Sequence, residues 1–377
     1  MKKVLFVASV AKKHIMVFHL PYLEWFKNNG YEVHVCANND YENRQECNIP
    51  FCDEFYEVPF ERSPLKKENI LAYKKLKNLI NQNKYDIIHC HTPIGGTLGR
   101  LASKNAKRNG TKVIYTAHGF HFFKGASYKN WLIYYPVEKW LSRYTDLLIT
   151  INQEDYDAAI NRKFKSKKVV LVNGVGINLE KFQPQTEEKK LSLREKYGYN
   201  ADDFILMYAG ELSYRKHQNL LISVAGKLKD RIPNLKILLA GNGDLEEQFR
   251  KQIEDLSVHS QVELLGFRKD IDNLMNLADL AVSASRQEGL PVNVMEAMAT
   301  GLPLVVTDCR GNRDLVTDNE NGYVVGIDDV EKFADSVEKL YRSKELRQKF
   351  GEKSLENIKR YSLENVLKEM GAIYSEI

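Results

Sequence analysis

Short apolar segments alternate with amphipathic helical patterns along almost the whole chain. Strand-like segments of the first half occupy residues 4–9, 32–37, 85–91, 112–117 and 146–151. Those of the second half occupy residues 204–209, 235–240, 262–265, 280–283 and 304–307. Helical patterns fall between most of them, for example over residues 22–29, 65–81 and 218–229. This alternation predicts βαβ units with parallel sheets, and therefore an α/β fold.

The series of strands restarts near the middle of the chain. A polar stretch over residues 183–200, with Pro184 and a Glu/Lys-rich run, separates the two series and is predicted to be the interdomain linker. A chain of 377 residues is also too long for one ordinary core. We therefore expect two doubly wound, Rossmann-like domains, over residues 1–180 and 181–360, whose ligand crevices face a central cleft. Residues 361–377 have a helical pattern with Ser362 at the N-cap.

Composition and cysteine usage are those of a reduced, cytoplasmic protein. Hydrophobic residues make up 43% and charged residues 28% of the chain. The five cysteines are odd in number and form no CxxC motif, which argues against a disulfide framework. The lysines and apolar residues at the N-terminus resemble a signal peptide, but the apolar run is short and fits a first β-strand better. No apolar run approaches the ~20 residues of a membrane span.

The net charge of +5 conceals a basic half and an acidic half. Residues 1–182 carry 28 Lys and Arg against 17 Asp and Glu, whereas residues 183–377 carry 27 against 33. An anionic membrane surface, a lipid diphosphate or nucleic acid would suit the basic half; a solvated lysine surface is the alternative. Nucleic acid is disfavoured because the aromatic residues are not interleaved with arginines as in RNA-binding motifs.

Residues 129–141 are rich in aromatic side chains with lysines beside them. This composition suits a membrane interface, and peripheral attachment at the inner face of the plasma membrane is one prediction from it. A core helix of the first domain is the other interpretation, and the one the pattern favours.

The most informative segment covers residues 285–303, a turn and a short helix between two apolar strands. Glu288 lies in the turn, and Glu296 lies eight residues further, about two helical turns on. The residues at the helix start can present backbone N–H groups to an anion or suit the first turn: Gly289, Leu290, Pro291 and Val292. Two carboxylates beside a helix N-terminus, at the end of a parallel strand, predict a site for hydroxyl groups flanking a phosphate, as in a nucleotide sugar.

The segment EGLPVNVMEAMATGLPLV, with its E-x7-E spacing, closely resembles the donor-binding segment of glycosyltransferase family 4, retaining enzymes with the GT-B fold. Other segments resemble that family in order: LVNGVGINLEKFQP (171–184), YAGELSYRKHQNLL (208–221), LLGF (264–267) and NGYVV (321–325). Residues 19–35 and 116–125 resemble bacterial enzymes of capsule and exopolysaccharide assembly. The resemblance covers nearly the whole chain and implies that the helix at 361–377 crosses back onto the first domain.

The resemblance also implies roles for residues of the second domain. Glu288 would bind hydroxyl groups of the donor sugar, Glu296 would bind the ribose, and Lys216 would stabilise the departing diphosphate. The segment that lines the base would include Gly266 and Phe267. The family commonly has an arginine where this chain has Glu211, and Arg215 is the candidate for the missing cation.

Three histidines of the first domain are candidates for contact with the reacting centre or the acceptor. By resemblance, the loop that carries His118 faces the reacting centre, where an imidazole can hold a sugar hydroxyl. His121 follows in the same loop. His14 lies in a first loop that lacks the glycine pair common in the family, and it is expected on the acceptor side.

The sequence His89-Cys90-His91 invites a metal interpretation. Strand alternation, however, places Cys90 on the opposite face from the histidines, and no second cluster has zinc spacing. His91 is expected near the acceptor, and no metal site and no cofactor are predicted.

Together these features predict a retaining, metal-independent glycosyltransferase. It would move a sugar from a uridine-linked donor to a lipid-linked saccharide in capsule or exopolysaccharide synthesis. A nucleotide-sugar epimerase of the same fold and a non-catalytic pseudo-enzyme that binds sugar nucleotides are the alternatives. No protein nucleophile is assigned.

Overall fold

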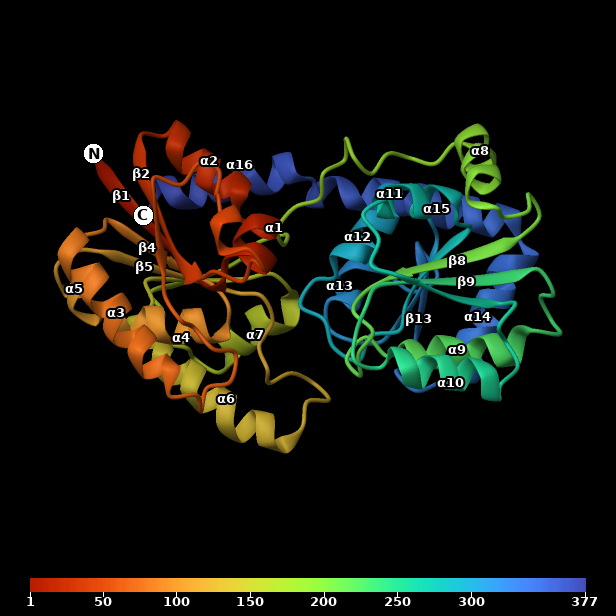
Figure 1. Ribbon diagram of the computed structural model, residues 1–377, viewed down its shortest axis with the longest axis horizontal. Helices are drawn as coiled ribbons and strands as arrows, with labels where there is room; N and C mark the ends of the chain where they lie inside the picture. The colour runs from red at the N-terminus through yellow and green to blue at the C-terminus, as the bar shows by residue number, and fades with distance from the viewer. The chain divides into compact units, whose positions relative to one another are not determined.

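The computed structural model describes residues 1–377, which form two compact units. Unit 1 comprises Met1–Val175 together with Val366–Ile377, and unit 2 comprises Gly176–Asn365. Each unit is built on one parallel sheet flanked by helices (Figure 1). The predicted α/β class with two Rossmann-like domains is confirmed.

The sheet of unit 1 has seven strands in the order β3-β2-β1-β4-β5-β6-β7. Their bounds are β1 (Lys2–Val10), β2 (Tyr31–Asn38), β3 (Glu54–Glu57), β4 (Ile87–Cys90), β5 (Lys112–Ala117), β6 (Leu147–Thr150) and β7 (Lys168–Leu171). The helical elements are η1 (Ala11–Ile15), α1 (Met16–Phe18), α2 (Leu20–Asn28), η2 (Arg44–Glu46), α3 (Glu68–Asn83), α4 (Pro93–Ala102), α5 (Lys104–Arg108), α6 (Tyr128–Leu141), η3 (Ser142–Tyr144) and α7 (Gln153–Asn161). The strand order reverses between β1 and β4.

Strand β1 explains why unit 1 has a core on both faces of its sheet. Val4 and Phe6 belong to one buried cluster, and Leu5 and Val7 belong to the other. Because both faces are covered, β1 is apolar throughout instead of alternating.

Helices α2 and α16 (Leu363–Ser375) cover the first of these clusters, and they lie side by side in Figure 1. Tyr374 of α16 packs against Phe26 of α2 with ring centroids 4.6 Å apart. The end of the chain therefore completes the core of unit 1.

Helix α6 is exposed or half-buried along almost its whole length, so it is not the core helix that its composition favoured. Leu141 is its only fully buried residue, whereas Tyr128 and Leu132 are 82% and 67% exposed. The helix is fixed to α4 by a bidentate ion pair from Arg100 to Glu138, at 2.8 and 3.1 Å. Trp131, Tyr134 and Tyr135 pack partly against unit 1, whereas Leu132, Ile133 and Val137 face solvent.

The sheet of unit 2 has six strands in the order β10-β9-β8-β11-β12-β13. Their bounds are β8 (Phe204–Ala209), β9 (Leu235–Ala240), β10 (Val262–Gly266), β11 (Leu280–Ser283), β12 (Leu304–Thr307) and β13 (Gly322–Val325). The helices are α8 (Glu187–Tyr197), α9 (Gln218–Leu228), α10 (Glu246–Asp255), α11 (Ile271–Leu277), α12 (Val292–Ala299), α13 (Asn312–Leu315), α14 (Val330–Arg342), α15 (Lys344–Ile358) and η4 (Lys359–Tyr361). Here the strand order reverses between β8 and β11.

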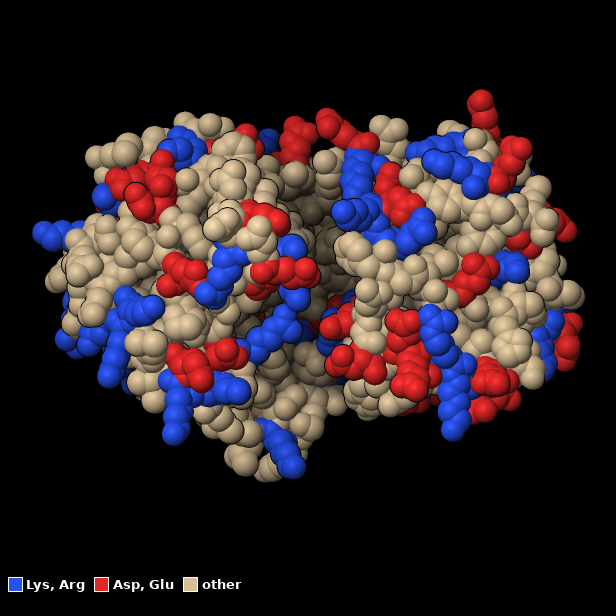
Figure 2. All heavy atoms as spheres, viewed as in Figure 1, with Lys and Arg blue, Asp and Glu red and all other residues tan.

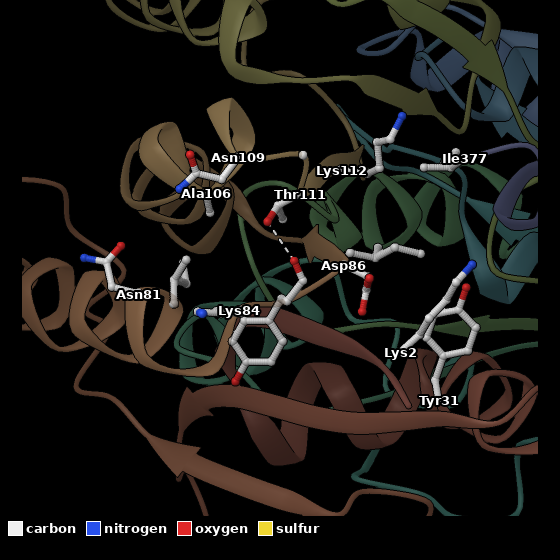
Figure 3. Close-up of a pocket in the computed structure, with 14 residues that line it drawn as sticks. Lys2, Tyr31, Asn81, Lys84, Asp86, Ala106, Asn109, Thr111, Lys112 and Ile377 are labelled. Atoms are coloured by element: carbon white, nitrogen blue, oxygen red, sulfur yellow. Dashed lines mark hydrogen bonds between the residues drawn. The ribbon is translucent and has the colours of Figure 1, made fainter.

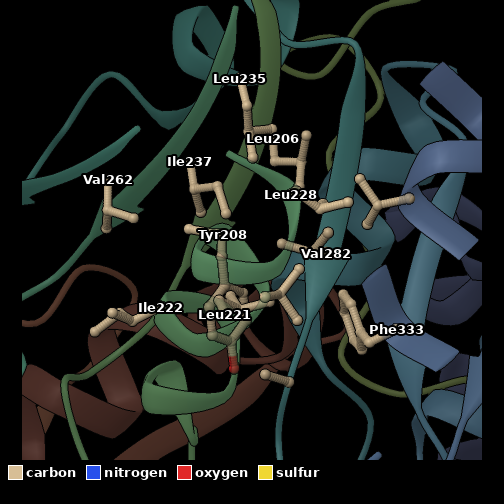
Figure 4. Packing of buried hydrophobic residues seen from close by; sticks show 14 of the residues in the cluster. Leu206, Tyr208, Leu221, Ile222, Leu228, Leu235, Ile237, Val262, Val282 and Phe333 are labelled. Carbon is tan, nitrogen blue, oxygen red and sulfur yellow. The ribbon is translucent and has the colours of Figure 1, made fainter. Parts of the chain in front are cut away.

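The core of unit 2 joins the strands to α9 and α14. In Figure 4, Ile237 and Val282 from two strands lie near Leu228 of α9 and Phe333 of α14, and all four are at most 2% exposed. This packing holds β8 and β11 side by side, which fixes the loops that follow them.

Residues 187–197 form helix α8, although the polar composition predicted a linker there. Thr186 caps the helix by accepting a hydrogen bond from the backbone N–H of Lys189, and Gly198 ends it with φ of +79°. No helix of either unit combines the length and apolar character that crossing a membrane requires.

Candidate active site

The candidate site of unit 2 lies where its strand order reverses. Lys216 follows β8, and Glu288 follows β11, which is the neighbour of β8. In doubly wound sheets, the loops after two such strands diverge and leave a crevice at the carboxyl edge of the sheet. The topology thus brings together two residues that are 72 positions apart in the sequence.

Glu288 is the centre of a compact charged group. Its Oε1 accepts hydrogen bonds from Nζ of Lys216 at 2.6 Å and from Oγ of Ser285 at 2.7 Å. Its Oε2 accepts one from Nη1 of Arg215 at 3.2 Å. The side chains of Glu288 and Lys216 are only 8% and 11% exposed, while that of Arg215 is 44% exposed. The carboxylate is therefore shared between one buried and one accessible cation.

Two buried hydroxyl groups, those of Tyr208 and Ser285, hold Lys216 and Glu288 in position. The hydroxyl group of Tyr208 on β8 lies 2.7 Å from Oγ of Ser285 and 3.1 Å from the backbone oxygen of Lys216. A third support is the buried Arg310, whose Nε donates to the backbone oxygen of Glu288 at 2.9 Å. Tyr208 and Ser285 were not among the predicted site residues. Ser285 could have been suggested by its place at the start of the motif that contains Glu288.

The charges around Glu288 determine its protonation. Burial by itself would raise the pKa of Glu288, but the charges of Lys216 and Arg215, together with their hydrogen bonds and that of Ser285, hold the pKa below its ordinary value. Glu288 is therefore ionised at neutral pH, and its single negative charge leaves the group with Lys216 and Arg215 at a net charge of +1.

The turn after Glu288 leads into α12, whose N-terminus has no side-chain cap. The backbone N–H groups of Gly289, Leu290 and Val292 donate no hydrogen bond within the chain, and Pro291 has no N–H. Gly311 lies against this turn with φ of +83°, and a Cβ atom there would stand 2.6 Å from the backbone oxygen of Gly289. Uncapped N–H groups and the helix dipole form a suitable position for an anion.

Glu296 lies further along α12, and its carboxylate makes no hydrogen bond or ion pair within the chain. Burial raises the pKa of Glu296 to about 7, and the charge of Asp272 adds to this, while Lys181 and Lys216 oppose it. A desolvated carboxylate without a partner is a ready acceptor for hydroxyl groups of a ligand.

Three other residues of unit 2 stand out in the sequence, namely Glu211, Gly266 and Phe267. Glu211 is exposed and makes no ion pair with Lys216, while its backbone oxygen accepts from the side chain of Gln218. Gly266 ends β10 with φ of +65°, and the side chain of Phe267 is 70% exposed. Arg215, and not Glu211, is thus the residue that contacts Glu288.

The candidate residues of unit 1 line a separate cavity of about 560 Å³. His14, His118 and His121 all contribute to it, at the carboxyl ends of β1 and β5. The ring of His121 stacks on that of Tyr134 from α6, with centroids 4.6 Å apart. His14 lies in the π-helical turn η1, where the sequence predicts a loop.

Another cavity of unit 1, of about 600 Å³, lies at the opposite edge of the sheet (Figure 3). It is lined by residues at the start of strands, such as Lys2 and Lys112, and by Tyr85, whose backbone oxygen accepts from Oγ1 of Thr111 at 2.7 Å. Ligands of doubly wound sheets bind at the carboxyl edge, so we do not assign this cavity to the site.

Comparison with known proteins identifies the family of the chain. Residues 3–152 match the family model of 4-like glycosyl transferases, and residues 189–356 match that of glycosyl transferases group 1. The chain is 46% identical to the putative glycosyltransferase EpsD of Bacillus subtilis, over 99% of this chain and 96% of that protein. It is 29% identical to the UDP-Gal:alpha-D-GlcNAc-diphosphoundecaprenol alpha-1,3-galactosyltransferase of Escherichia coli, over 75% of each.

Among solved structures, Alr3699/HepE of Anabaena in complex with UDP and glucose superposes over 100% of both chains, with a TM-score of 0.81 and 20% identity. That likeness supports the fold, and the relative at 46% identity establishes the family. The chain belongs to the group 1, family 4-like glycosyltransferases with the GT-B fold.

Proposed function

We propose that this glycosyltransferase moves a sugar from a UDP-linked donor to a lipid-linked saccharide, with retention of anomeric configuration, in the synthesis of a cell-surface polysaccharide. The observation that carries the proposal is the group formed by Lys216, Arg215 and Glu288 beside the uncapped N-terminus of α12. The relative from Escherichia coli, whose name specifies UDP-Gal and a diphosphoundecaprenol-linked acceptor, supports both substrate classes.

In this proposal, the donor displaces part of the ion-pair group. The diphosphate takes the positive charges of Lys216 and Arg215 and the N–H groups at the start of α12, which releases the oxygens of Glu288 for hydroxyl groups of the sugar. Charge that develops on the departing diphosphate then meets groups that are already in position, without a divalent ion at the diphosphate. Because no protein nucleophile is assigned, the acceptor hydroxyl would attack the donor sugar on the same face from which the diphosphate departs.

Unit 1 would hold the acceptor in the cavity of about 560 Å³, where His118 and His14 are available to sugar hydroxyl groups. Ile133 and Val137 of α6 line the same cavity and are also exposed to solvent. A lipid-linked acceptor could thus place its saccharide in the cavity while its lipid remains beside the apolar face of α6.

Donor binding by wild type and Glu296→Gln protein tests the proposal. The ribose hydroxyl groups would donate to the ionised form of Glu296, whose pKa is about 7, so we expect affinity for a UDP-sugar to rise about tenfold from pH 6 to pH 8. The variant should bind more weakly and without this pH dependence. Titration calorimetry with UDP-, GDP- and ADP-sugars measures both effects. Equal binding of all three would contradict a uridine-specific site.

Transfer itself is tested by incubating the protein with the donor identified in this way and a polyprenyl-diphosphate saccharide as acceptor. NMR then determines the anomeric configuration of the product. An α-linked product from an α-linked donor supports retention, and an inverted product would contradict it. Binding without transfer, or conversion of the donor without acceptor, would contradict the proposed reaction.

Peripheral membrane binding is a further part of the proposal. Helices α3 and α6 both pack against α4; α3 carries exposed Lys74 and Lys75, and α6 carries the exposed apolar side chains. Figure 2 shows lysine and arginine side chains over the lower part of unit 1, where Figure 1 places these helices. Basic groups beside exposed apolar side chains favour an anionic membrane surface.

We expect the protein to sediment with vesicles that contain phosphatidylglycerol at low ionic strength and to be released by salt. The double variant Leu132→Glu/Ile133→Glu should bind at least about tenfold more weakly, because two carboxylates replace apolar groups at the interface. Leu191→Glu, on the exposed side of α8 in unit 2, is the matched control and should bind like wild type. Equal binding by all three proteins would contradict a role for α6.

A further inference from the structure

Four histidines from separate segments of unit 1 converge on one point. His14 belongs to the turn that follows β1, His19 directly precedes α2, His91 follows β4, and His118 follows β5. Because the strand order of unit 1 reverses between β1 and β4, this point lies at the carboxyl edge of the sheet where doubly wound folds place ligands.

The distances within this histidine cluster suit a metal ion. Nε2 of His14 lies 3.1 Å from Nε2 of His19, and Nδ1 of His91 lies 3.3 Å from Nε2 of His118. One ring nitrogen from each of the four histidines lies within 4.8 Å of all the others. Zinc–nitrogen bonds of about 2.0–2.1 Å imply ligand separations of about 3.4 Å in a tetrahedron. Two pairs thus have nearly the required separation, and the others, at 4.8 Å or less, need to close by at most about 1.4 Å.

Two rings of the cluster each have one nitrogen in a pair described above and one nitrogen without a partner. The unpartnered atoms are Nδ1 of His19 and Nε2 of His91, and both residues are 1% exposed. An unsatisfied buried polar group is costly, and each ring has a vacant nitrogen that an ion could bind if the ring turned over. Rings of His19, His91 and His118 also line a cavity of about 10 Å³, a volume on the order of one water-sized group.

Metals bind imidazole through the lone pair of a ring nitrogen, which the neutral form of histidine supplies. His89 is not a ligand candidate, because its two nitrogens are engaged with Thr116 at 2.8 Å and Tyr374 at 3.1 Å.

We propose that His14, His19, His91 and His118 bind one divalent transition-metal ion, Zn²⁺ in the first instance. Neutral imidazole suits zinc, copper and nickel, whereas magnesium and calcium prefer oxygen ligands. The ion would tie η1 to the ends of β4 and β5 and so fix the walls of the cavity assigned to the acceptor. His14 and His118, which are partly exposed, would leave its charge open to solvent or to an anion in that cavity.

This site could not be found from the spacing of histidines in the sequence. His89 and His91 share a strand face, as alternation requires, and Phe6 lies beside both of them. The other ligand candidates come from loops more than 20 residues away, which only the sheet topology brings together. The test needs no substrate, so its failure is distinguishable from failure of the proposed transfer, although a bound ion would leave His14 and His118 only one ring nitrogen each for the acceptor.

The test measures metal content in protein without a histidine tag. The full chain is stripped with EDTA, dialysed against buffered Zn²⁺ or Co²⁺, and analysed by mass spectrometry for metals and by visible absorption. We expect one ion per chain, a dissociation constant below about 1 µM, and an intense visible spectrum typical of tetrahedral Co²⁺. Zn²⁺ should also raise Tm, since it binds the folded form.

His14→Asn and His118→Asn, at the two partly exposed positions, should each weaken Zn²⁺ binding by about 100-fold. His259→Asn, an exposed histidine of unit 2, is the control and should bind like wild type. Circular dichroism of the metal-free variants checks their folding. If either variant does not fold, the stoichiometry, the Co²⁺ spectrum and the Tm shift of the wild type remain decisive. Less than about 0.2 ion per chain in the wild type, or undiminished binding by both folded variants, would overturn the proposal.

Discussion

Lys216→Ala should reduce kcat for sugar transfer by about 10²- to 10³-fold, with a smaller change in the KM for the donor. Lys216 is the most deeply placed cation of the group, and its Nζ lies 2.6 Å from Glu288. A preorganised charge of this kind acts mainly where negative charge develops in the transition state, and removal of one such group commonly has an effect of this size. Steady-state kinetics with saturating acceptor measure it.

The control is Lys227→Ala. Lys227 lies in α9 of the same unit and pairs with Glu331 at the surface, so its loss removes the same charge without touching the candidate site. We expect Arg215→Ala to be intermediate, because the side chain of Arg215 is 44% exposed and its contact with Glu288 is longer. If Lys216→Ala keeps more than a tenth of the wild-type kcat, Lys216 does not stabilise the leaving group.

Glu288→Gln should affect stability and activity together. The substitution leaves Lys216 buried beside a neutral amide, and breaking a buried ion pair from one side commonly costs about 3 kcal/mol. Calorimetric unfolding at pH 7 measures this loss. The transfer rate should fall by about 10- to 100-fold, since charge-assisted hydrogen bonds to the sugar become neutral ones.

The pH dependence of this loss of stability shows whether the ion pairs of Glu288 cause it. The pKa of Glu288 is lowered on folding, so its contribution to stability is present above its ordinary value of 4.5 and disappears as pH falls through the folded pKa. The difference in stability between wild type and Glu288→Gln should therefore be constant from pH 6 to 8 and shrink below pH 4.5. Ser285→Ala, which removes one neutral donor, should show a smaller loss of about 1 kcal/mol. A difference that does not shrink at all as pH falls below 4.5 would show that the ion pairs are not its source.

The sequence predicts the central strands of both sheets and the edge strand β10, but not the other three edge strands. Strands such as β1 and β8 are buried on both faces, so their apolar runs stand out. The edge strand β3 consists of Glu54–Glu57 and is only partly buried, so it has no comparable signal. Strands β7 and β13 are also only partly buried and were likewise not among the predicted strands.

Helix α8 shows a different kind of error. Its charge-rich sequence suggested a linker, although an N-cap residue, Thr186, and a terminal glycine, Gly198, bracket it. Those end signals are local and can be recognised from sequence. The exposure of α6 has no such local signal in the sequence. It depends on how the helix packs against α4, including the ion pair from Arg100.

For the candidate site, the sequence indicated the residues but not their contacts. The motif around Glu288 identified the carboxylates and the start of α12. That Arg215 shares Glu288 with Lys216 follows from the packing of β8 beside β11, which no local pattern specifies. Convergence of the four histidines of unit 1 depends in the same way on strand order.

The packing of α16 has a consequence for the order in which this protein can fold during synthesis. Tyr374 contacts Trp25 and Phe26, which leave the ribosome long before Tyr374 does. The whole of unit 2, Gly176–Asn365, is translated in between. Unit 2 is therefore a continuous segment that can fold as it emerges, whereas unit 1 keeps an apolar face uncovered until the second unit has been made. A nascent chain halted before residue 366 should present that face to chaperones.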